Sequence, residues 1–258
     1  MTDISLTDTN SDGINDGDED SDQDGISNIE EVTITLTDPG LVDTDGNGVN
    51  DGSEDNDSDG LSNYQELSIT NTNPAQADSN NNGTIDGNED RDNDGLSDSI
   101  ELNQTQTNFN DTDSNSDSEL DINEDNDLDG LSNVDELHET LTNPGLYDTD
   151  GDGISDGDED KDNDGLSDSI ELNQTLTNIS TIDTDGNGTN DGDEDLDLDG
   201  LTNVQELSLT LTEIDNIDTD GDGINDGDED ADQDGLSNLI EINQTLTDPS
   251  VLDTDQNG

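Results

Sequence analysis

The chain has 258 residues, of which 22% are apolar and 1% aromatic, and its 75 acidic residues against two basic ones give a formal charge of −73. An average domain is roughly 45–50% apolar, so a large hydrophobic core is excluded, and carboxylate repulsion would leave the chain disordered unless cations supplied countercharge. The charge also excludes nucleic acid and anionic membrane surfaces as partners, and the lack of cysteine excludes disulfides and thiolate metal sites.

A strict 35-residue period organises the sequence. Residues 1–7 read as the end of a preceding unit, and the N-terminal stretch MTDISLTDTN has neither the basic nor the apolar region of a signal peptide. No stretch is apolar enough for membrane insertion. Seven repeats and a truncated eighth, which indicates a longer array, follow without insertion or deletion: 8–42, 43–77, 78–112, 113–147, 148–182, 183–217, 218–252 and 253–258. Such constant spacing predicts structural units stacked on their neighbours.

Each repeat begins with two acidic loops of twelve residues that abut directly. In the 148–182 repeat they read DTDGDGISDGDE and DKDNDGLSDSIE, with carboxylates at loop positions 1, 3 and 5, Gly at 6, a side-chain oxygen at 9 and Glu at 12. Calcium takes six to eight oxygen ligands, glycine permits the tight turn that points alternate residues inward, and the final glutamate can chelate with both oxygens. The pattern predicts one calcium ion per loop, and fourteen ions would reduce the net charge to about −45.

The predicted side-chain ligands occupy loop positions 1, 3, 5, 9 and 12, and the carbonyl at position 7 completes each set. In the first loops they are Asp8, Asn10, Asp12, Asp16, Glu19, Asp43, Asp45, Asn47, Asp51, Glu54, Asp78, Asn80, Asn82, Asp86, Glu89, Asp113, Asn115, Asp117, Asp121, Glu124, Asp148, Asp150, Asp152, Asp156, Glu159, Asp183, Asp185, Asn187, Asp191, Glu194, Asp218, Asp220, Asp222, Asp226 and Glu229. In the second loops they are Asp20, Asp22, Asp24, Asn28, Glu31, Asp55, Asp57, Asp59, Asn63, Glu66, Asp90, Asp92, Asp94, Asp98, Glu101, Asp125, Asp127, Asp129, Asn133, Glu136, Asp160, Asp162, Asp164, Asp168, Glu171, Asp195, Asp197, Asp199, Asn203, Glu206, Asp230, Asp232, Asp234, Asn238 and Glu241.

The two loops differ in regularity. The second loop keeps its pattern in all seven repeats, whereas the first has Asn at position 5 in three repeats and Ser118 in place of glycine in one. We therefore expect the strongest sites in the second loops and a weak or distorted site near Ser118. Calcium is favoured over magnesium because the ligand number is high and the loops are flexible, and zinc or copper would call for His or Cys. The lone His138 is expected to be a surface residue.

A short helical turn is expected after the second loop. Ser or Thr stands at its start and apolar residues recur about every third position, so that Leu131, Val134 and Leu137 would share one face. Next, Thr occupies repeat positions 28 and 30 in every repeat, and this alternation predicts a short extended segment with both hydroxyls on one side.

The threonines and the recurring sequons have structural and functional interpretations. A β-bridge or a hydroxyl cap would explain the threonines, and a row of O-linked sugars is the functional alternative. Asparagine sequons of sequence NQT also recur every 70 residues. The glycosylation candidates are Thr35, Thr37, Thr175, Thr177, Asn103, Asn173 and Asn243.

The paired loops, DTDGDGISDGDEDKDNDGLSD and their kin, together with the TLTNPxLxDTDGDG linkers, resemble the cysteine-free bacterial form of the thrombospondin type 3 repeat over nearly the whole chain. The resemblance implies a calcium-wrapped, mostly irregular fold on extracellular or cell-surface proteins, often in stalks and spacers, with calcium as the only crosslink. An RTX β-roll would need glycine-rich nonapeptides that are missing. An EF-hand or dockerin pair would need a helix between the loops, for which the abutment of Glu159 and Asp160 leaves no room.

The expected fold is a mostly irregular, calcium-stabilised tandem-repeat rod with short helical turns, short extended segments and no globular core. The leading functional hypothesis is an extracellular or cell-surface rigid spacer, stalk or fibril segment, and the alternatives are a surface-adhesin repeat region or a calcium-buffering module. Expected partners are calcium ions, covalent glycans, and further repeats of the same chain or neighbouring fibril chains. We expect no enzyme activity, because every carboxylate cluster has a metal-loop explanation.

Overall fold

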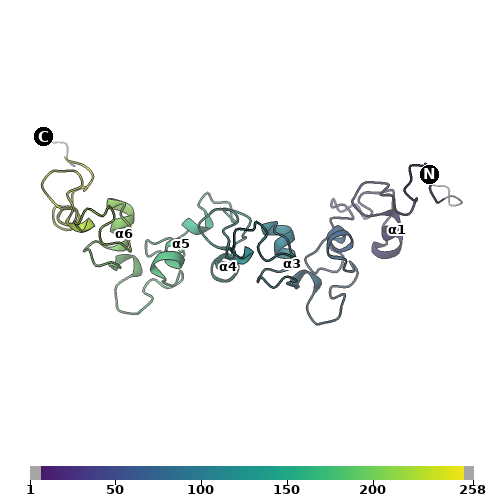
Figure 1. The fold of residues 1–258 in the computed structure, drawn as a ribbon, viewed down its shortest axis with the longest axis horizontal. Coiled ribbons are helices and arrows are strands. Elements are labelled where there is room, and N and C mark those ends of the chain that lie inside the picture. Colours follow the sequence, from purple (N-terminus) through teal and green to yellow (C-terminus); the bar gives the residue numbers. More distant parts are fainter. Residues whose placement is uncertain (1–6, 253–258) are drawn as a thin grey trace. The chain divides into compact units, whose positions relative to one another are not determined.

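The structure is a computed structural model, and it describes residues 7–252. Residues 1–6 and the predicted eighth repeat at 253–258 lie outside the described residues. The chain divides into two compact units, Met1–Ile122 and Asn123–Gly258. Residues 7–252 contain no β-strand, and short helices joined by loops and turns account for all of their regular structure (Figure 1).

Each repeat carries one short helix, in which a three-residue α-helical turn continues into five residues of π-helix. Short 3-10 turns lie near the end of the first loop in five repeats. The α-π pairs are α1 Asn28–Glu30 with η1 Glu31–Thr35, α2 Asn63–Gln65 with η2 Glu66–Thr70, α3 Asp98–Ile100 with η4 Glu101–Thr105, α4 Asn133–Asp135 with η6 Glu136–Thr140, α5 Asp168–Ile170 with η8 Glu171–Thr175, α6 Asn203–Gln205 with η10 Glu206–Thr210, and α7 Asn238–Ile240 with η12 Glu241–Thr245. The 3-10 turns are η3 Asp86–Asn88, η5 Asp121–Asn123, η7 Asp156–Asp158, η9 Asp191–Asp193 and η11 Asp226–Asp228.

The helix begins where the sequence predicts a capped turn. Ser62 has extended backbone angles, its hydroxyl accepts a hydrogen bond from the Gln65 backbone N–H, and its own N–H donates to the Gln65 side chain at 2.8 Å. This reciprocal capping satisfies two donors that a helix start would leave unpaired. Helix α2 therefore starts at the residue that also occupies position 9 of the second loop, Asn63.

The threonine pair forms a helix end, which corrects the expected extended segment. Thr35 is the last residue of η1, and Leu36 then takes a left-handed conformation with φ +62°. The Thr37 N–H donates back to the Glu31 carbonyl at 3.1 Å, which closes the helix. The two hydroxyls do lie on one side, because the Thr35 and Thr37 Oγ1 atoms are 2.8 Å apart. Thr37 Oγ1 also donates to the Glu31 carboxylate at 3.4 Å, so the hydroxyls cap a loop glutamate.

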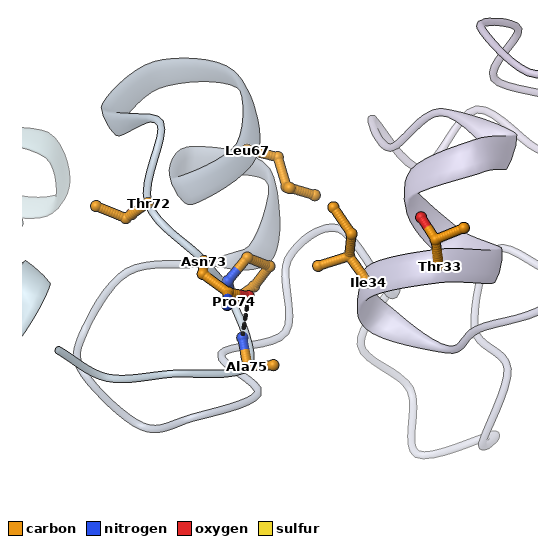
Figure 2. A pocket seen from close by; sticks show the side chains of 7 residues that line it. All are labelled: Thr33, Ile34, Leu67, Thr72, Asn73, Pro74 and Ala75. Carbon is orange, nitrogen blue, oxygen red and sulfur yellow. Dashed lines mark hydrogen bonds between the residues drawn. The ribbon is translucent and has the colours of Figure 1, made fainter. Parts of the chain in front are cut away.

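The apolar core is reduced to isolated side chains. Position 7 of the second loop supplies fully buried aliphatic residues such as Leu61 and Leu131, while Tyr64 on the same helical face is 44% exposed. Figure 2 shows Ile34 of η1 and Leu67 of η2 pointing toward one another across a groove that Pro74 also lines. Apolar side chains of neighbouring repeats therefore face one another here, while most of each repeat has no apolar interior.

Candidate metal centre

The second loop brings its first three predicted ligands together. In the 43–77 repeat, carboxylate oxygens of Asp55, Asp57 and Asp59 lie within 4.8 Å of one another. The turn is shaped by backbone N–H groups, since Asp55 Oδ2 accepts from Gly60 at 3.0 Å and Asp59 Oδ1 accepts from Leu61 at 2.8 Å. Gly60 has φ +98°, which an L side chain rarely adopts, so glycine is strongly favoured at loop position 6.

A second group of carboxylates spans two repeats. Asp59 and Glu66 come from the second loop of the 43–77 repeat, and Asp86 comes from the first loop of the next repeat, with oxygens again within 4.8 Å. All three residues are buried, at 3%, 0% and 1% exposure. The Asp24, Glu31 and Asp51 side chains form the same arrangement one repeat earlier, and eleven further groups of three or more residues meet the same distance criterion in the described part of the chain. We call such a set the junction cluster. It consists of the aspartate at position 5 and the glutamate at position 12 of a second loop, together with the aspartate at position 9 of the first loop in the next repeat.

Hydrogen bonds from backbone N–H groups to aspartate side chains show that the junction recurs along the chain. In each case the position-5 aspartate of a second loop accepts from the N–H of a glycine 28 residues later, at position 10 of the next first loop. The pairs are Gly87 with Asp59 at 3.2 Å, Gly157 with Asp129 at 2.9 Å, Gly192 with Asp164 at 2.9 Å, and Gly227 with Asp199 at 2.7 Å. The contacts between consecutive repeats are therefore regular.

Many of the buried carboxylate oxygens in these clusters have no hydrogen-bond partner. Both oxygens of Asp57 and of Glu66, and Oδ2 of Asp92 and of Asp94, are buried and unpaired. Burial, together with the charges of Asp57 and Asp59, raises the pKa of Glu66 to about 8. Burial and neighbouring carboxylates likewise raise the pKa of Glu101, Glu136, Glu171 and Glu206 to about 8.

The donor set fits a hard divalent cation. Calcium binds oxygens at 2.3–2.6 Å, so two ligands of one ion lie at most about 5 Å apart, and the 4.8 Å groups meet this limit. Buried, unpaired carboxylates are strongly unfavourable unless a cation compensates them. Asp55, Asp57 and Asp59 would hold one ion, and Asp59, Glu66 and Asp86 a second one that contacts both repeats.

The first loops form more open turns. Asp43 Oδ2 accepts from the Gly48 N–H at 2.9 Å, as expected for a calcium loop, but Asp45 and Asn47 are exposed. The Asn47 amide donates to Glu54 Oε1 at 2.7 Å, and the equivalent position-5 asparagines, Asn82 and Asn187, make the same bond to Glu89 and Glu194 at 2.9 and 2.7 Å. An amide at position 5 thus occupies one oxygen of the position-12 glutamate.

Ser118 keeps the turn of the loop in which it replaces glycine. Its N–H donates to Asp113 Oδ2 at 3.0 Å, the bond that Gly83 makes to Asp78 one repeat earlier. Its φ is +86°, a left-handed value that costs a non-glycine residue about 1–2 kcal/mol. The loop is therefore strained at the predicted position, although its hydrogen bond is intact.

Position 9 of the second loop has a different environment from the one the loop pattern predicts. Asn63 Nδ2 donates to the carbonyl of Asp51 at 2.6 Å, and Asn203 donates to the carbonyl of Asp191 at 2.8 Å. These amides join the two loops of one repeat. Because Asp51 also belongs to the junction cluster, the asparagine orients a cluster residue through its backbone.

The junction role of first-loop position 9 was not visible in the loop pattern, which assigned Asp51 and Asp86 to their own loops. One signal could have revealed it. Six of the seven repeats have Gly directly after this aspartate, at a loop position where calcium binding requires no glycine. In the structure a Cβ at Gly87 would collide with the carbonyl oxygen of Asp59, so this glycine permits the repeats to approach.

Two of the predicted sequon asparagines, one in each compact unit, contact the preceding repeat of the same unit. Asn103 Nδ2 donates to the carbonyl of Gly60 and Asn173 Nδ2 to the carbonyl of Gly130, both at 3.0 Å. The Thr175 and Thr177 hydroxyls are 2.7 Å apart, and Thr177 donates to Glu171. These polar atoms therefore have structural partners in the folded chain.

Comparison with known proteins agrees with this architecture. A search of curated proteins found no match, and no helix in residues 7–252 is long and apolar enough to cross a membrane. The family model described as the bacterial TSP3 repeat matches six stretches: 20–39, 55–77, 90–113, 148–161, 160–174 and 218–233. The chain therefore contains repeats of the bacterial TSP3 family at these stretches.

Proposed function

We propose that this chain is an extracellular or cell-surface calcium-binding array that acts as a rigid spacer, stalk or fibril segment. The observation that carries the proposal is the junction cluster of Asp59, Glu66 and Asp86, in which buried carboxylates from two repeats meet and both Glu66 oxygens are unpaired. An ion held there contacts both repeats, so binding it fixes one repeat relative to the next.

Calcium would neutralise part of the carboxylate charge. It would also supply the stabilising contacts that a hydrophobic core supplies in other proteins. If one site had a dissociation constant near 10 μM and free calcium were about 1 mM, binding would stabilise the folded state by about 2.7 kcal/mol. Several such sites are enough to fold a domain of ordinary stability. Weak calcium loops fill at extracellular levels, which supports a location outside the cell.

Small-angle X-ray scattering with calcium and with a chelator tests the spacer role. The calcium-bound chain is expected to have a defined maximum dimension, and the chelated chain a broad, flexible-chain profile. A profile that does not change on chelation would contradict the proposal, and it would favour the buffering alternative if calorimetry still found many bound ions.

A single-residue variant links the change to the junction. Glu66→Gln removes one carboxylate from the cluster and should leave local flexibility at that junction in saturating calcium. Glu139→Gln is the matched control, because Glu139 is an exposed glutamate of the short helix η6. If both variants behaved like the parent, the junction cluster would not be the element that stiffens the array.

A further inference from the structure

The only two basic residues of the sequence occupy the same repeat position. Arg91 and Lys161 are each the second residue of a second loop, and in these two repeats alone position 9 of that loop is Asp, namely Asp98 and Asp168. In the other five repeats position 9 is Asn and the second residue is uncharged. A basic side chain thus accompanies each aspartate at this position.

The asparagine version joins the two loops with a neutral amide. The Asn63 Oδ1 atom accepts from the Asn56 N–H at 3.4 Å, while Nδ2 donates to the Asp51 carbonyl at 2.6 Å. Asn63 is fully buried. The amide thereby uses a donor and an acceptor at one buried position, which a carboxylate cannot do.

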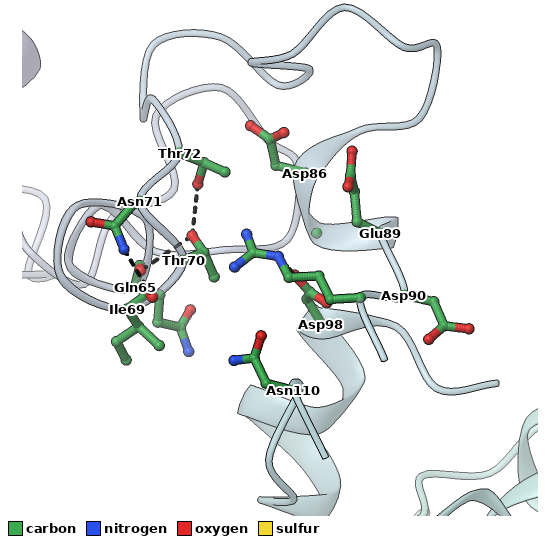
Figure 3. A network of polar contacts seen from close by, with 12 residues as sticks. Gln65, Ile69, Thr70, Asn71, Thr72, Asp86, Glu89, Asp90, Asp98 and Asn110 are labelled. Carbon is green, nitrogen blue, oxygen red and sulfur yellow. Dashed lines mark hydrogen bonds and ion pairs between the residues drawn. The ribbon is translucent and has the colours of Figure 1, made fainter. Parts of the chain in front are cut away.

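In the 78–112 repeat, where position 9 is an aspartate, Arg91 supplies a partner for the buried carboxylate. Asp98 is fully buried, and Arg91 Nε lies 2.8 Å from Asp98 Oδ2. The guanidinium carbon also lies 5.1 Å from the centre of the Phe109 ring. Figure 3 shows Asp98 near Glu89 and Asp90, so its other charged neighbours are acidic.

Lys161 lies at the equivalent position of the 148–182 repeat but makes different contacts. Its backbone N–H donates to Asp168 Oδ1 at 3.1 Å, as the backbone N–H of Asn56 does to Asn63, and its ammonium donates to the carbonyl of Glu139, in the preceding repeat, at 3.1 Å. Asp168 is also buried. Arg91 thus forms a direct ion pair with its aspartate, whereas the charge of Lys161 acts on Asp168 without a direct ion pair and lowers the pKa of that carboxyl against the larger effect of burial.

We propose that Arg91 and Lys161 are built-in counter-ions, which hold Asp98 and Asp168 at the contact between the two loops as positioning residues and not as calcium ligands. A buried carboxylate without a counter-ion is far more costly than a lost neutral hydrogen bond. The counter-ion part stands whether or not the array binds calcium, and the statement about ligands rests on the proposed function.

Hydrogen exchange of the full chain in calcium, followed by mass spectrometry, tests the counter-ion. In Arg91→Ser, peptides covering 86–105 should exchange about tenfold faster or more, while peptides covering 156–175 serve as the reference in the same molecule. Arg91→Lys, and Arg91→Ser combined with Asp98→Asn, should both stay within about threefold of the parent, because each restores a pairing that the chain itself uses. If Arg91→Ser exchanged like the parent, or if adding Asp98→Asn gave no rescue, the counter-ion role would be overturned.

A reciprocal pair in the 43–77 repeat provides a gain-of-function check. Asn63→Asp alone should speed exchange there, and adding Asn56→Arg should reverse most of the effect. Calorimetry of the Arg91→Ser and Asp98→Asn double variant tests the ligand statement: unchanged ion number and affinity supports it, and a lost ion or about tenfold weaker binding at one site overturns it. If the parent bound no calcium, the exchange comparison in ion-free buffer would still decide the counter-ion part.

Discussion

Asp59 accepts a hydrogen bond from the backbone N–H of Gly87, 28 residues further along the chain, at 3.2 Å. The same aspartate belongs to the three-carboxylate group within its own loop and to the junction cluster. One side chain therefore connects the local loop to the neighbouring repeat. Changes on either side of this contact should affect both the stability of the junction and its affinity for calcium.

Gly87→Ala should weaken the junction, because the new Cβ would collide with the Asp59 carbonyl oxygen. Overpacking of this kind typically costs about 1–3 kcal/mol. We expect a higher calcium concentration at the midpoint of calcium-dependent folding, measured by circular dichroism. Gly17→Ala is the matched control at the same repeat position, where the nearest atom to a new Cβ is Ile29 Cβ at 3.6 Å. Equal midpoints for the two variants would contradict the close approach of the repeats.

Calcium affinity should rise with pH. The pKa of Glu136 is raised to about 8 by burial and by Asp127 and Asp129, so the ion-free cluster holds protons at neutral pH that calcium must displace. A raised carboxyl pKa stabilises the ion-free fold below the unfolded pKa of about 4.5, and this contribution is lost as pH rises through about 8. Calcium binding should therefore release protons at pH 6 and few at pH 9. Calorimetry in two buffers of different ionisation enthalpy measures the release, and an equal proton count at both values would refute the prediction.

Ser118→Gly should strengthen the first loop of the 113–147 repeat. Glycine relieves the left-handed strain at φ +86°, although its greater freedom in the unfolded chain offsets part of the gain. A net stabilisation of about 0.5–1 kcal/mol is expected. The reverse change, Gly153→Ser, places serine at the same position of the 148–182 repeat, where φ is +100°, and should weaken that loop. Calcium titrations of both variants decide the matter, and shifts in the same direction would count against strain as the cause.

Asn103→Ser should loosen one junction by about 1 kcal/mol, because it removes the amide that donates to the Gly60 carbonyl. Serine already stands at the equivalent position of the previous repeat, Ser68. Since an N-linked sugar would replace a hydrogen of the same nitrogen, we also expect Asn103 to be unglycosylated in the folded chain. Hydrogen exchange near Gly60 and peptide mass analysis measure these two effects, and a fully glycosylated Asn103 would rule out this contact as a constant feature.

Much of the local structure could be predicted from the spacing of residues. The loop turn needs only Asp55 and Gly60, five residues apart, and the helix start needs only Ser62 and Gln65, so short-range hydrogen bonds decide both. The prediction of an extended segment at the threonines was wrong. The alternation of threonines alone cannot show that the chain turns at the left-handed residue Leu36, which lets the Thr37 hydroxyl cap the Glu31 carboxylate. Whether each loop binds one ion stays a prediction.

The sequence by itself determined the repeat, the two acidic loops and the need for cations, because each follows from composition or from contacts within about twelve residues. Only the tertiary structure decided that Asp86 belongs with Asp59 and Glu66, since residues 20–27 positions apart meet only when neighbouring repeats pack together. It also decided that Asp98 faces Arg91. In both cases the physical reason is burial, because a carboxylate removed from water must find its compensating charge among whatever the packed repeats bring beside it.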